Sequence, residues 1–442
     1  MSEQDAAVRE ADVLVIGAGP GGSTIAALLA QRGHRVALLE KGRHPRFHIG
    51  ESLLPANLPL LDALGVGEQV REIGMRKLGA EFVSPSDGRR QEFLFADAWD
   101  KSMPYAYQVR RSQFDEILAR NAVRLGADLH EGCRVRTVEF AAGEWPVQAQ
   151  AQCEDGSTHR WRARFLVDAS GRDTLLATQM RDKQRNARHN SAAMFAHFRG
   201  ASRFEGEREG HISIFWFDHG WFWFIPLSDG ATSIGAVVWP YYLKRRVEPV
   251  REYFLATIAL CPPLAERLAG ATLISDVEAT GNYSYSARRS CGPHHLLVGD
   301  AYAFIDPVFS SGVMLAMQSA FAGADTIEEC LRSPRRAAAA LRRYDRLARH
   351  GPREFSWFIY RVTSPTLREI FLAPRNPLRM KEALLSVLAG DIFGRTPIWR
   401  SIWYFKWLYR IASLLHPRRS LQALRRRRLN IQPAGSGPMP AR

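Results

Sequence analysis

The sequence ADVLVIGAGPGG at residues 11–22 decides the fold prediction. Ala11 to Ile16 is an apolar run rich in β-branched residues, which predicts a buried parallel strand. The stretch from Ser23 to Gln31 predicts a helix, and Arg35 to Leu39 predicts a second strand that leads into Glu40. Strand, glycine-rich turn, helix, strand and terminal acid follow one another in the order that a dinucleotide-binding motif requires.

Each glycine of this motif has a physical role. Gly17 permits the tight turn, Gly19 lets the backbone approach a pyrophosphate, and Gly22 lets the helix pack closely on the strand. The helix N-terminus after Pro20 presents free amides and a positive dipole end to the phosphates. Glu40 is placed to accept hydrogen bonds from an adenosine ribose.

Three later stretches resemble motifs of FAD-dependent aromatic hydroxylases. They are RSQFD beginning at Arg111, FLVDASG around Asp168 and LLVGDA around Asp300. In that superfamily the arginine begins a long helix and approaches the flavin phosphate and ribityl region, and the last aspartate contacts the ribityl chain. The resemblance implies FAD rather than NAD, and Lys41 and Val135 complete the set of predicted cofactor-binding residues.

Between about residues 12 and 330 the chain resembles flavin-dependent halogenases, and most closely their shorter members. WFWFIP at residues 221–226 matches the family pattern WxWxIP. Trp221, Trp223, Ile225 and Pro226 carry the match, and in the family this segment lies near the flavin and keeps substrate away from it. The alternative interpretation is a strand whose aromatic side chains only stabilise a core.

Lys77 is the predicted catalytic residue. It lies in a short predicted strand after GESLLP at residues 50–55, with Gly79 two positions on, as the halogenase lysine does. In the family, reduced FAD and O2 convert a halide to hypohalous acid, which the lysine guides to the substrate. The ammonium can hydrogen-bond the oxidant, or the neutral amine, favoured by burial, can be halogenated. The alternative interpretation is a solvated surface lysine.

FIDPVFSSG at residues 304–312 matches the family pattern FxxPxxSxG, with Phe304 and Pro307 in the matching positions. Ser310, Ser311 and Gly312 place hydroxyl groups and backbone amides at the start of a predicted helix, which suits a chloride or bromide ion beside the flavin. An ordinary serine N-cap is the alternative interpretation.

Phe309 departs from the tryptophan halogenases, which have a glutamate at this position. The departure argues against free tryptophan and for an electron-rich pyrrole or phenol, carried by an acidic acyl or peptidyl carrier protein in secondary-metabolite biosynthesis. The sequence contains no second nucleotide motif, so we expect a separate flavin reductase to supply FADH2.

The predicted fold class is α/β. We expect a Rossmann-like FAD-binding domain of the para-hydroxybenzoate hydroxylase type from residues 1–180 and 280–330. An inserted antiparallel β-sheet substrate domain is predicted for 181–280, a helical region for 331–430 and a disordered tail for 431–442.

The net charge is +15, and the chain has eleven Lys or Arg residues but no acid after Asp391. This basic segment suits an acidic carrier protein or weak peripheral contact with an anionic membrane; we expect no nucleic-acid partner. The aromatic helix predicted around residues 399–415 has three interpretations: a lid over the substrate tunnel, a membrane-surface helix, or a helix packed in the core.

The five cysteines are scattered, which predicts free thiols, no metal site and a cytoplasmic location. The adjacent histidines at 294 and 295 have no third ligand spaced to join them. Two other functions remain open on the same FAD frame. One is a flavin-dependent hydroxylase or isoprenoid-chain reductase that acts directly at the flavin, and the other is a non-catalytic flavin-binding protein at a membrane.

Overall fold

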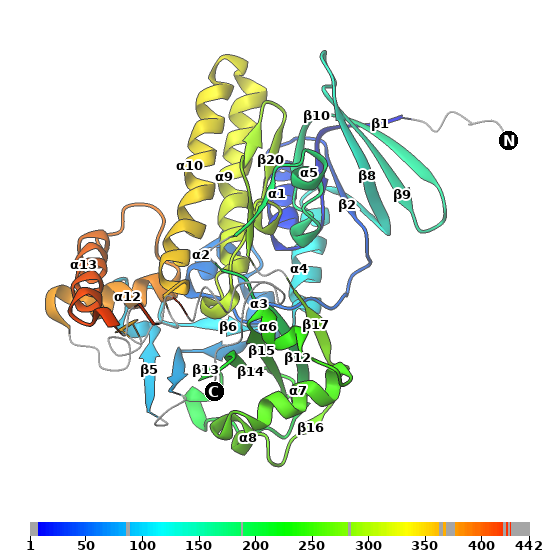
Figure 1. Cartoon of the computed structure of the whole chain (residues 1–442). Coiled ribbons are helices and arrows are strands. Elements are labelled where there is room, and N and C mark those ends of the chain that lie inside the picture. Colours follow the sequence, from blue (N-terminus) through cyan, green and yellow to red (C-terminus); the bar gives the residue numbers. More distant parts are fainter. Residues whose placement is uncertain are drawn as a thin grey trace.

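The computed structural model describes residues 8–84, 89–186, 189–281, 284–361, 366–367, 376–418, 421–422 and 425. The predicted tail 431–442 and the arginines at 426–428 lie outside the described residues. Two large sheets with helices on their outer sides make up most of the described chain (Figure 1).

The first sheet has the parallel core that the N-terminal sequence predicts. Its strand order is β19-β20-β10-β1-β2-β7, and β1 pairs in parallel with both β2 and β10. Its bounds are β1 Val8–Ile16, β2 Val36–Glu40, β7 Asp128–Glu131, β10 Thr158–Asp168, β19 Cys291–Gly292 and β20 His295–Leu297, with β8 Cys133–Phe140 and β9 Val147–Cys153 attached through β10. The carboxyl ends of β1, β10 and β20 meet at one edge, where ligands of such sheets bind.

Helices cover the first sheet. The long helix α9 (Gly312–Arg332) packs against α1 (Pro20–Gln31) and lies beside α10 (Pro334–Ile359), as Figure 1 shows. The helix α4 (Arg111–Arg124) packs on α1, and α2 (Leu58–Ala63), α3 (Gly67–Ile73) and α5 (Leu175–Gln179) are short. The predictions that Arg111 opens a helix and that a helix follows residue 312 are confirmed.

The second sheet is antiparallel apart from one pair, β13 with β4. Its order is β16-β12-β15-β14-β13-β4-β5, with bounds β4 Gly79–Val83, β5 Arg90–Leu94, β12 Ala192–Arg199, β13 Ile212–Phe217, β14 Gly220–Pro226, β15 Ala231–Val238 and β16 Thr272–Leu273, and β17 Glu278–Thr280 pairs with β12. The strands β4 and β5 come from the N-terminal segment, so this sheet is built from both sides of the predicted boundary at residue 180. Three helices pack on it: α6 (Pro240–Lys244), α7 (Val250–Ala259) and α8 (Pro262–Arg267).

Two small sheets connect the large ones. The strands β3 (Met75–Lys77) and β6 (Ala106–Gln108) form an antiparallel pair, and β11 (Lys183–Arg185), β18 (Tyr285–Ala287) and β21 (Ala303–Phe304) form the other sheet. The prediction that Lys77 lies in a short strand is confirmed.

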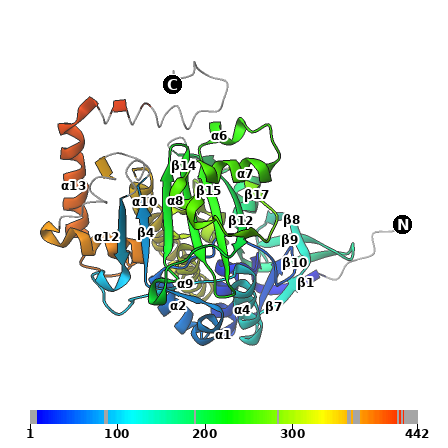
Figure 2. The same cartoon turned by 90° about the horizontal axis from the view of Figure 1, so that it is seen from below.

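The C-terminal part is helical, as predicted. The helices α12 (Met380–Ala389) and α13 (Trp399–Leu415) lie at one edge of the molecule in both views (Figures 1 and 2). Ile402 and Phe405 of α13 are buried in a core that also contains Phe95 and Phe309. No helix in the described part of the chain is long and apolar enough to cross a membrane.

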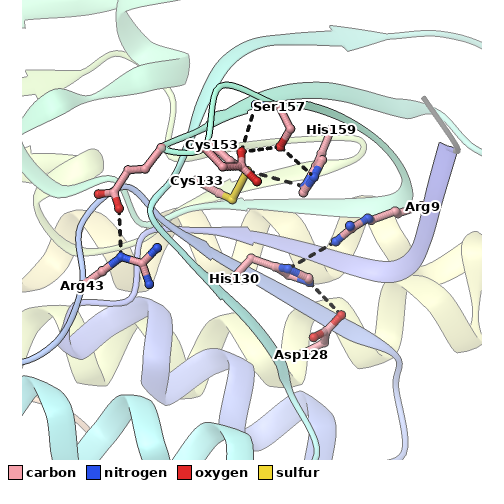
Figure 3. The surroundings of a disulfide bond; sticks show 10 residues. Arg9, Arg43, Asp128, His130, Cys133, Cys153, Ser157 and His159 are labelled. Carbon is pink, nitrogen blue, oxygen red and sulfur yellow. Dashed lines mark hydrogen bonds and ion pairs between the residues drawn. A yellow bond between two sulfur atoms is a disulfide. The ribbon is translucent and has the colours of Figure 1, made fainter. Parts of the chain in front are cut away.

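The prediction of five free thiols is wrong for two of them. Cys133 and Cys153 form a disulfide, because the register of β8 and β9 places them directly opposite each other with their Cα atoms 4.0 Å apart (Figure 3). His159 lies beside them, with Nδ1 3.5 Å from the sulfur of Cys153. Twenty residues separate the two cysteines in the sequence, so spacing gave no sign of the pair. The argument from free thiols to a reducing compartment therefore loses its support.

Candidate functional site

A cavity of about 720 Å³ lies between the carboxyl edge of the first sheet and the inner face of the second. Among its lining residues are fifteen of the predicted site residues: Gly17, Gly19, Pro20, Glu40, Lys41, Arg111, Val135, Trp221, Trp223, Ile225, Asp300, Phe304, Pro307, Ser310 and Gly312. Five predicted residues are not in its lining: Gly22, Lys77, Asp168, Pro226 and Ser311. Residues from six separate stretches of the chain thus meet around one space.

The glycine-rich turn leaves room for a pyrophosphate. A Cβ atom at Gly19 would meet only the tip of Arg46, at 3.9 Å, so the backbone there is open to the cavity. Gly22 faces the other way, and a Cβ atom there would lie 1.8 Å from the carbonyl oxygen of Gly17. The turn therefore needs its glycines for the two different reasons that the sequence indicates, and α1 begins at Pro20 with its N-terminus at the cavity.

Glu40 is held at the end of β2 with its carboxylate at the cavity. It accepts hydrogen bonds from the amides of Ala18 (2.8 Å) and Gly42 (3.0 Å) and contacts the guanidinium of Arg46 at 3.2 Å. A carboxylate fixed in this way is suited to receive ribose hydroxyl groups. The neighbouring Lys41 instead extends to the surface, where it pairs with an exposed aspartate on the cavity rim.

Arg111 is buried and oriented by three contacts. It forms two hydrogen bonds with the carboxylate of Asp115, at 2.7 and 3.0 Å, and donates to the carbonyl of Ile49 at 2.8 Å. Sequence reasoning missed Arg46, which lines the cavity and lies within ion-pair distance of both Glu40 and Asp115. It adds positive charge where the phosphates of FAD would lie.

The two motif aspartates occupy different positions. Asp300 lines the cavity, and burial raises its pKa to about 6. The carboxylate of Asp168 lies behind the cavity wall, where it accepts the amides of Ser170 (2.9 Å) and Leu176 (2.8 Å). Asp168 therefore fixes the turn that lines the cavity, and burial raises its pKa too.

The loop before α9 has the features of an anion site. Ser310 adopts a left-handed conformation (φ 56°), and Gly312 begins the helix. The hydroxyl group of Ser311 is buried and has no hydrogen-bond partner in the described part of the chain. An unpaired buried hydroxyl beside a helix N-terminus is a donor available to a halide ion.

Indole rings form the wall between the cavity and the second sheet. Trp221, Trp223 and Ile225 alternate along β14 and so share the cavity face, as strand geometry requires. The ring of Trp223 packs against Gly235 of β15, where a Cβ atom would lie 2.1 Å from it, and its Nε1 donates to Ser233 at 3.1 Å. The wall is thus fixed in place from behind.

Lys77 is fully buried beside this cavity. Its Nζ donates to Ser52 Oγ (2.9 Å) and to the carbonyl of Leu53 (3.0 Å), and it lies 5.2 Å from the ring centroid of Phe95. Among the described residues no carboxylate pairs with it, and burial lowers its pKa to about 7. The interpretation of Lys77 as a solvated surface lysine is excluded.

Ser52 connects Lys77 with the cavity, and sequence reasoning missed its role. Its hydroxyl accepts the hydrogen bond from Lys77 while the residue itself lines the cavity. The signal was present in the GESLLP segment, but the contact spans 25 residues of sequence and needs the fold to reveal it.

More polar groups lie near Lys77. Gln108, whose Nε2 donates to the carbonyl of Gly210 at 3.1 Å, has a buried Oε1 that none of the described residues bonds. The ring of His211 is buried with Nδ1 2.8 Å from Glu92, and its Nε2 has no partner among the residues described. Burial, chiefly, and then the charges of Arg208 and Lys77 lower the pKa of His211, although the charge of Glu92 acts in the opposite direction. These groups could bind a polar atom of a substrate.

The comparisons with known proteins agree with this geometry. The family model described as an FAD binding domain matches residues 10–353. Tryptophan 2-halogenase of Chondromyces crocatus is 38% identical over 76% of this chain, and the match spans 64% of that relative's length. A flavin-dependent halogenase of Armillaria mellea is 35% identical over 73% of this chain and 68% of its own length. A chlorinase of Pseudomonas fluorescens, named for 1H-pyrrole-2-carbonyl-[peptidyl-carrier protein], is 29% identical over 87% of this chain and 90% of its own.

The solved structures point the same way. The myxobacterial chondrochloren halogenase CndH has a TM-score of 0.77 with 33% identity, covering 89% of this chain and 93% of its own. The brominase Bmp2 has a TM-score of 0.77 with 25% identity, covering 92% of this chain and 99% of its own. By its FAD-binding frame, its site and these relatives, the chain belongs to the family of flavin-dependent halogenases.

Proposed function

We propose that the protein is an FADH2-dependent halogenase that uses O2 and chloride or bromide to halogenate an electron-rich aromatic carbon. One observation carries the proposal: a buried lysine, with no carboxylate partner among the residues that the structure describes, is hydrogen-bonded to a serine that lines the flavin-sized cavity. A flavin enzyme that acts on its substrate directly at the flavin has no use for such an amine outside the cavity.

When bound, reduced FAD with O2 and halide supplies the oxidant, hypohalous acid. Glu40, Arg46, Arg111 and Asp300 would hold the cofactor in the cavity. The wall of Trp221, Trp223 and Ile225 would exclude bulky substrates from it, and the loop around Ser311 would hold the halide. The oxidant is small enough to pass Ser52 to the lysine.

Lys77 can then act in either of two ways. As an ammonium it donates a hydrogen bond that orients hypohalous acid toward the substrate. As a neutral amine it reacts with HOX to form N–X and water, and the aromatic carbon then takes X while its proton returns to the amine nitrogen. A pKa of about 7 populates both forms at neutral pH.

The substrate proposed is a pyrrole or phenol joined to an acidic carrier protein. Phe309 is buried in the core near Phe95 and offers no carboxylate for removing a proton from a less activated ring. The name of the Pseudomonas relative supports a carrier-bound pyrrole, and that of the Chondromyces relative supports tryptophan. A panel of free tryptophan, phenols and carrier-bound pyrrole separates these candidates by the relative kcat/KM.

A separate flavin reductase also belongs to the proposal. The family match accounts for one nucleotide-binding unit, and nothing in the sequence indicates a second one for a nicotinamide cofactor. Without added reductase or pre-reduced FAD, NADH alone is expected to give no product. Formation of product under those conditions would contradict the proposed need for a reductase.

The decisive experiment measures halide dependence. Protein, FAD, a flavin reductase, NADH, O2 and the substrate panel are combined with bromide, chloride or no halide, and products are identified by mass spectrometry. We expect halogenated product only with halide and none with Lys77→Met. FAD affinity of the variant should equal that of the parent, because Lys77 does not line the cavity. Hydroxylated or reduced product without halide would instead favour the hydroxylase or the reductase.

Ser52 is a positioning residue in this proposal, and its variants test whether it helps the oxidant reach Lys77. Ser52→Ala removes the acceptor of one lysine hydrogen bond, so we expect about tenfold less product and more free hypohalous acid, trapped in solution by a chlorination-prone probe. Ser52→Thr keeps the hydroxyl and should restore most of the yield of halogenated product. Equal yields of halogenated product and of free hypohalous acid from the alanine variant and the parent would rule out the role of Ser52.

A further inference from the structure

The helix α13 has a second apolar face that the core does not use. Ile402 and Phe405 are buried, whereas the opposite side of the helix is exposed. The large hydrophobic side chains on that exposed side are Trp403, Tyr404, Trp407, Leu408, Ile411, Leu414 and Leu415. At 100° per residue they form one continuous stripe along the helix.

The exposure on this stripe is large for apolar side chains. Trp403 and Trp407 are 57% and 50% exposed, and Leu414 and Leu415 are 77% and 71% exposed. The rings of Trp403 and Trp407 stack on each other with their centroids 6.3 Å apart. A contiguous exposed apolar face of this size marks an interaction site.

The charges around the stripe indicate which kind of partner it can bind. Arg400, Arg410 and Arg418 are exposed beside it, and residues 392–442 contain eleven basic residues and no acid. A second copy of the same face would bring like charges together, which disfavours self-association. The partner must therefore be anionic and able to accept bulky apolar side chains.

We propose that α13 is a peripheral membrane-binding helix that lies in the interface of an anionic lipid bilayer. Tryptophan and leucine on one face with arginine at its border is the composition of such helices, and their binding combines apolar insertion with attraction to acidic headgroups. The helix has 17 residues and is about 25 Å long, and it lies at the outer edge of the molecule (Figure 2).

The location of α13 gives membrane binding a consequence for substrates. The buried side of α13 belongs to the same core as Phe95, whose ring lies under the amine of Lys77, and Leu54, which follows the second acceptor of that amine. A bilayer that covers the outer face of α13 therefore lies on the far side of this helix from the apolar core around the lysine. We expect this arrangement to favour aromatic substrates that dissolve in a membrane.

The test is co-sedimentation of the full-length, FAD-loaded protein with lipid vesicles. We expect binding to vesicles of phosphatidylcholine with phosphatidylglycerol, weak binding to phosphatidylcholine alone, and weaker binding in high salt. Leu414→Gln with Leu415→Gln should lower the partition coefficient about tenfold. The matched control is Leu255→Gln on α7 with Leu260→Gln at the C-cap of that helix, two exposed leucines outside the stripe, and it should bind as the parent does.

Two further double variants separate membrane insertion from folding. Trp403→Phe with Trp407→Phe should still sediment with anionic vesicles but lose the quenching of tryptophan fluorescence by brominated lipids. Arg400→Glu with Arg410→Glu should weaken binding to the anionic vesicles about tenfold. Unchanged FAD affinity and unchanged melting temperature show that each variant is folded.

Four results overturn the proposal. The first three are absence of binding to anionic vesicles, binding that the α13 variants leave unchanged, and a parent protein that is a dimer which the leucine variants convert to monomers. Binding of an acidic carrier protein to this face, under conditions where vesicles do not bind, also overturns it and assigns the face to a protein partner. None of these readouts depends on halogenation, so they test membrane binding separately from the proposed activity.

Discussion

Replacing Lys77 with methionine tests the buried amine through the free energy of unfolding. The unfolded chain has the ordinary lysine pKa of 10.5, and burial lowers it to about 7 in the folded protein. Between these two values the unfolded chain holds a proton that the folded chain has lost. The free energy of unfolding therefore rises with pH across that window.

The size of the effect follows from the shift in pKa. At low pH the charged lysine costs the folded protein about 5 kcal/mol, and the cost falls to about 4 kcal/mol at pH 7 and about 1 kcal/mol at pH 10. Methionine has a similar length and carries no charge, so it avoids this cost. It leaves Ser52 and the carbonyl of Leu53 without their donor, which costs about 2 kcal/mol at any pH.

Lys77→Met should therefore be more stable than the parent by about 2 kcal/mol at pH 7 and less stable by about 1 kcal/mol at pH 10. The assay is urea unfolding of the FAD-free protein, followed by tryptophan fluorescence at several pH values across this range. Lys101→Met, at an exposed position, is the matched control, and its difference from the parent should stay constant.

A constant difference between Lys77→Met and the parent across this pH range would refute the reasoning. It would mean that the amine is solvated or paired with an acid in solution. A difference that grows in favour of the variant as the pH rises would contradict the direction of the shift itself.

Three further predictions concern the cofactor cavity and its supports. Gly22→Ala places a Cβ atom 1.8 Å from the carbonyl of Gly17, so we expect at least about a tenfold loss of FAD affinity by fluorescence titration; parent-like affinity would show that α1 can move away. Reducing the disulfide, or replacing Cys133 and Cys153 together by serine, should lower the free energy of unfolding by about 3 kcal/mol in urea titrations, and a free-thiol assay that already counts five thiols would show that the bond does not form in solution. Asp300→Asn removes a carboxylate whose folded pKa is raised to about 6 from 3.8, so the FAD-free variant should gain about 3 kcal/mol above pH 6. That gain should vanish as the pH falls below 4, and a gain that persists there would have another cause.

Local features, which depend only on neighbours along the chain, could be predicted from the sequence. The turn at Gly17 to Gly22 needs a particular backbone path and close packing, and glycine is the residue that supplies both. The helix that opens at Arg111 and the alternation of Trp221 and Trp223 on one face of a strand are also local features that the sequence predicts. Patterns of this kind repeat with the period of the helix or strand, so they are visible before folding.

Contacts between distant segments were decided only by the tertiary structure. The disulfide depends on the register of β8 against β9, and register is set by the packing of the whole sheet rather than by cysteine spacing. Ser52 meets Lys77 because the segment after residue 50 pairs with β6, which also pairs with the strand of the lysine. A motif shows that such residues are present, but not which of them touch.

The helix α13 shows this division most clearly. Its sequence is apolar on nearly all sides, so periodicity could not distinguish a lid, a core helix and a surface helix. The tertiary structure buries Ile402 and Phe405 and leaves Trp403 and Trp407 in solvent, because α10 and α12 cover one side of the helix only. The sequence thus determined the composition of the helix, and packing against its neighbours determined which face remains for a partner.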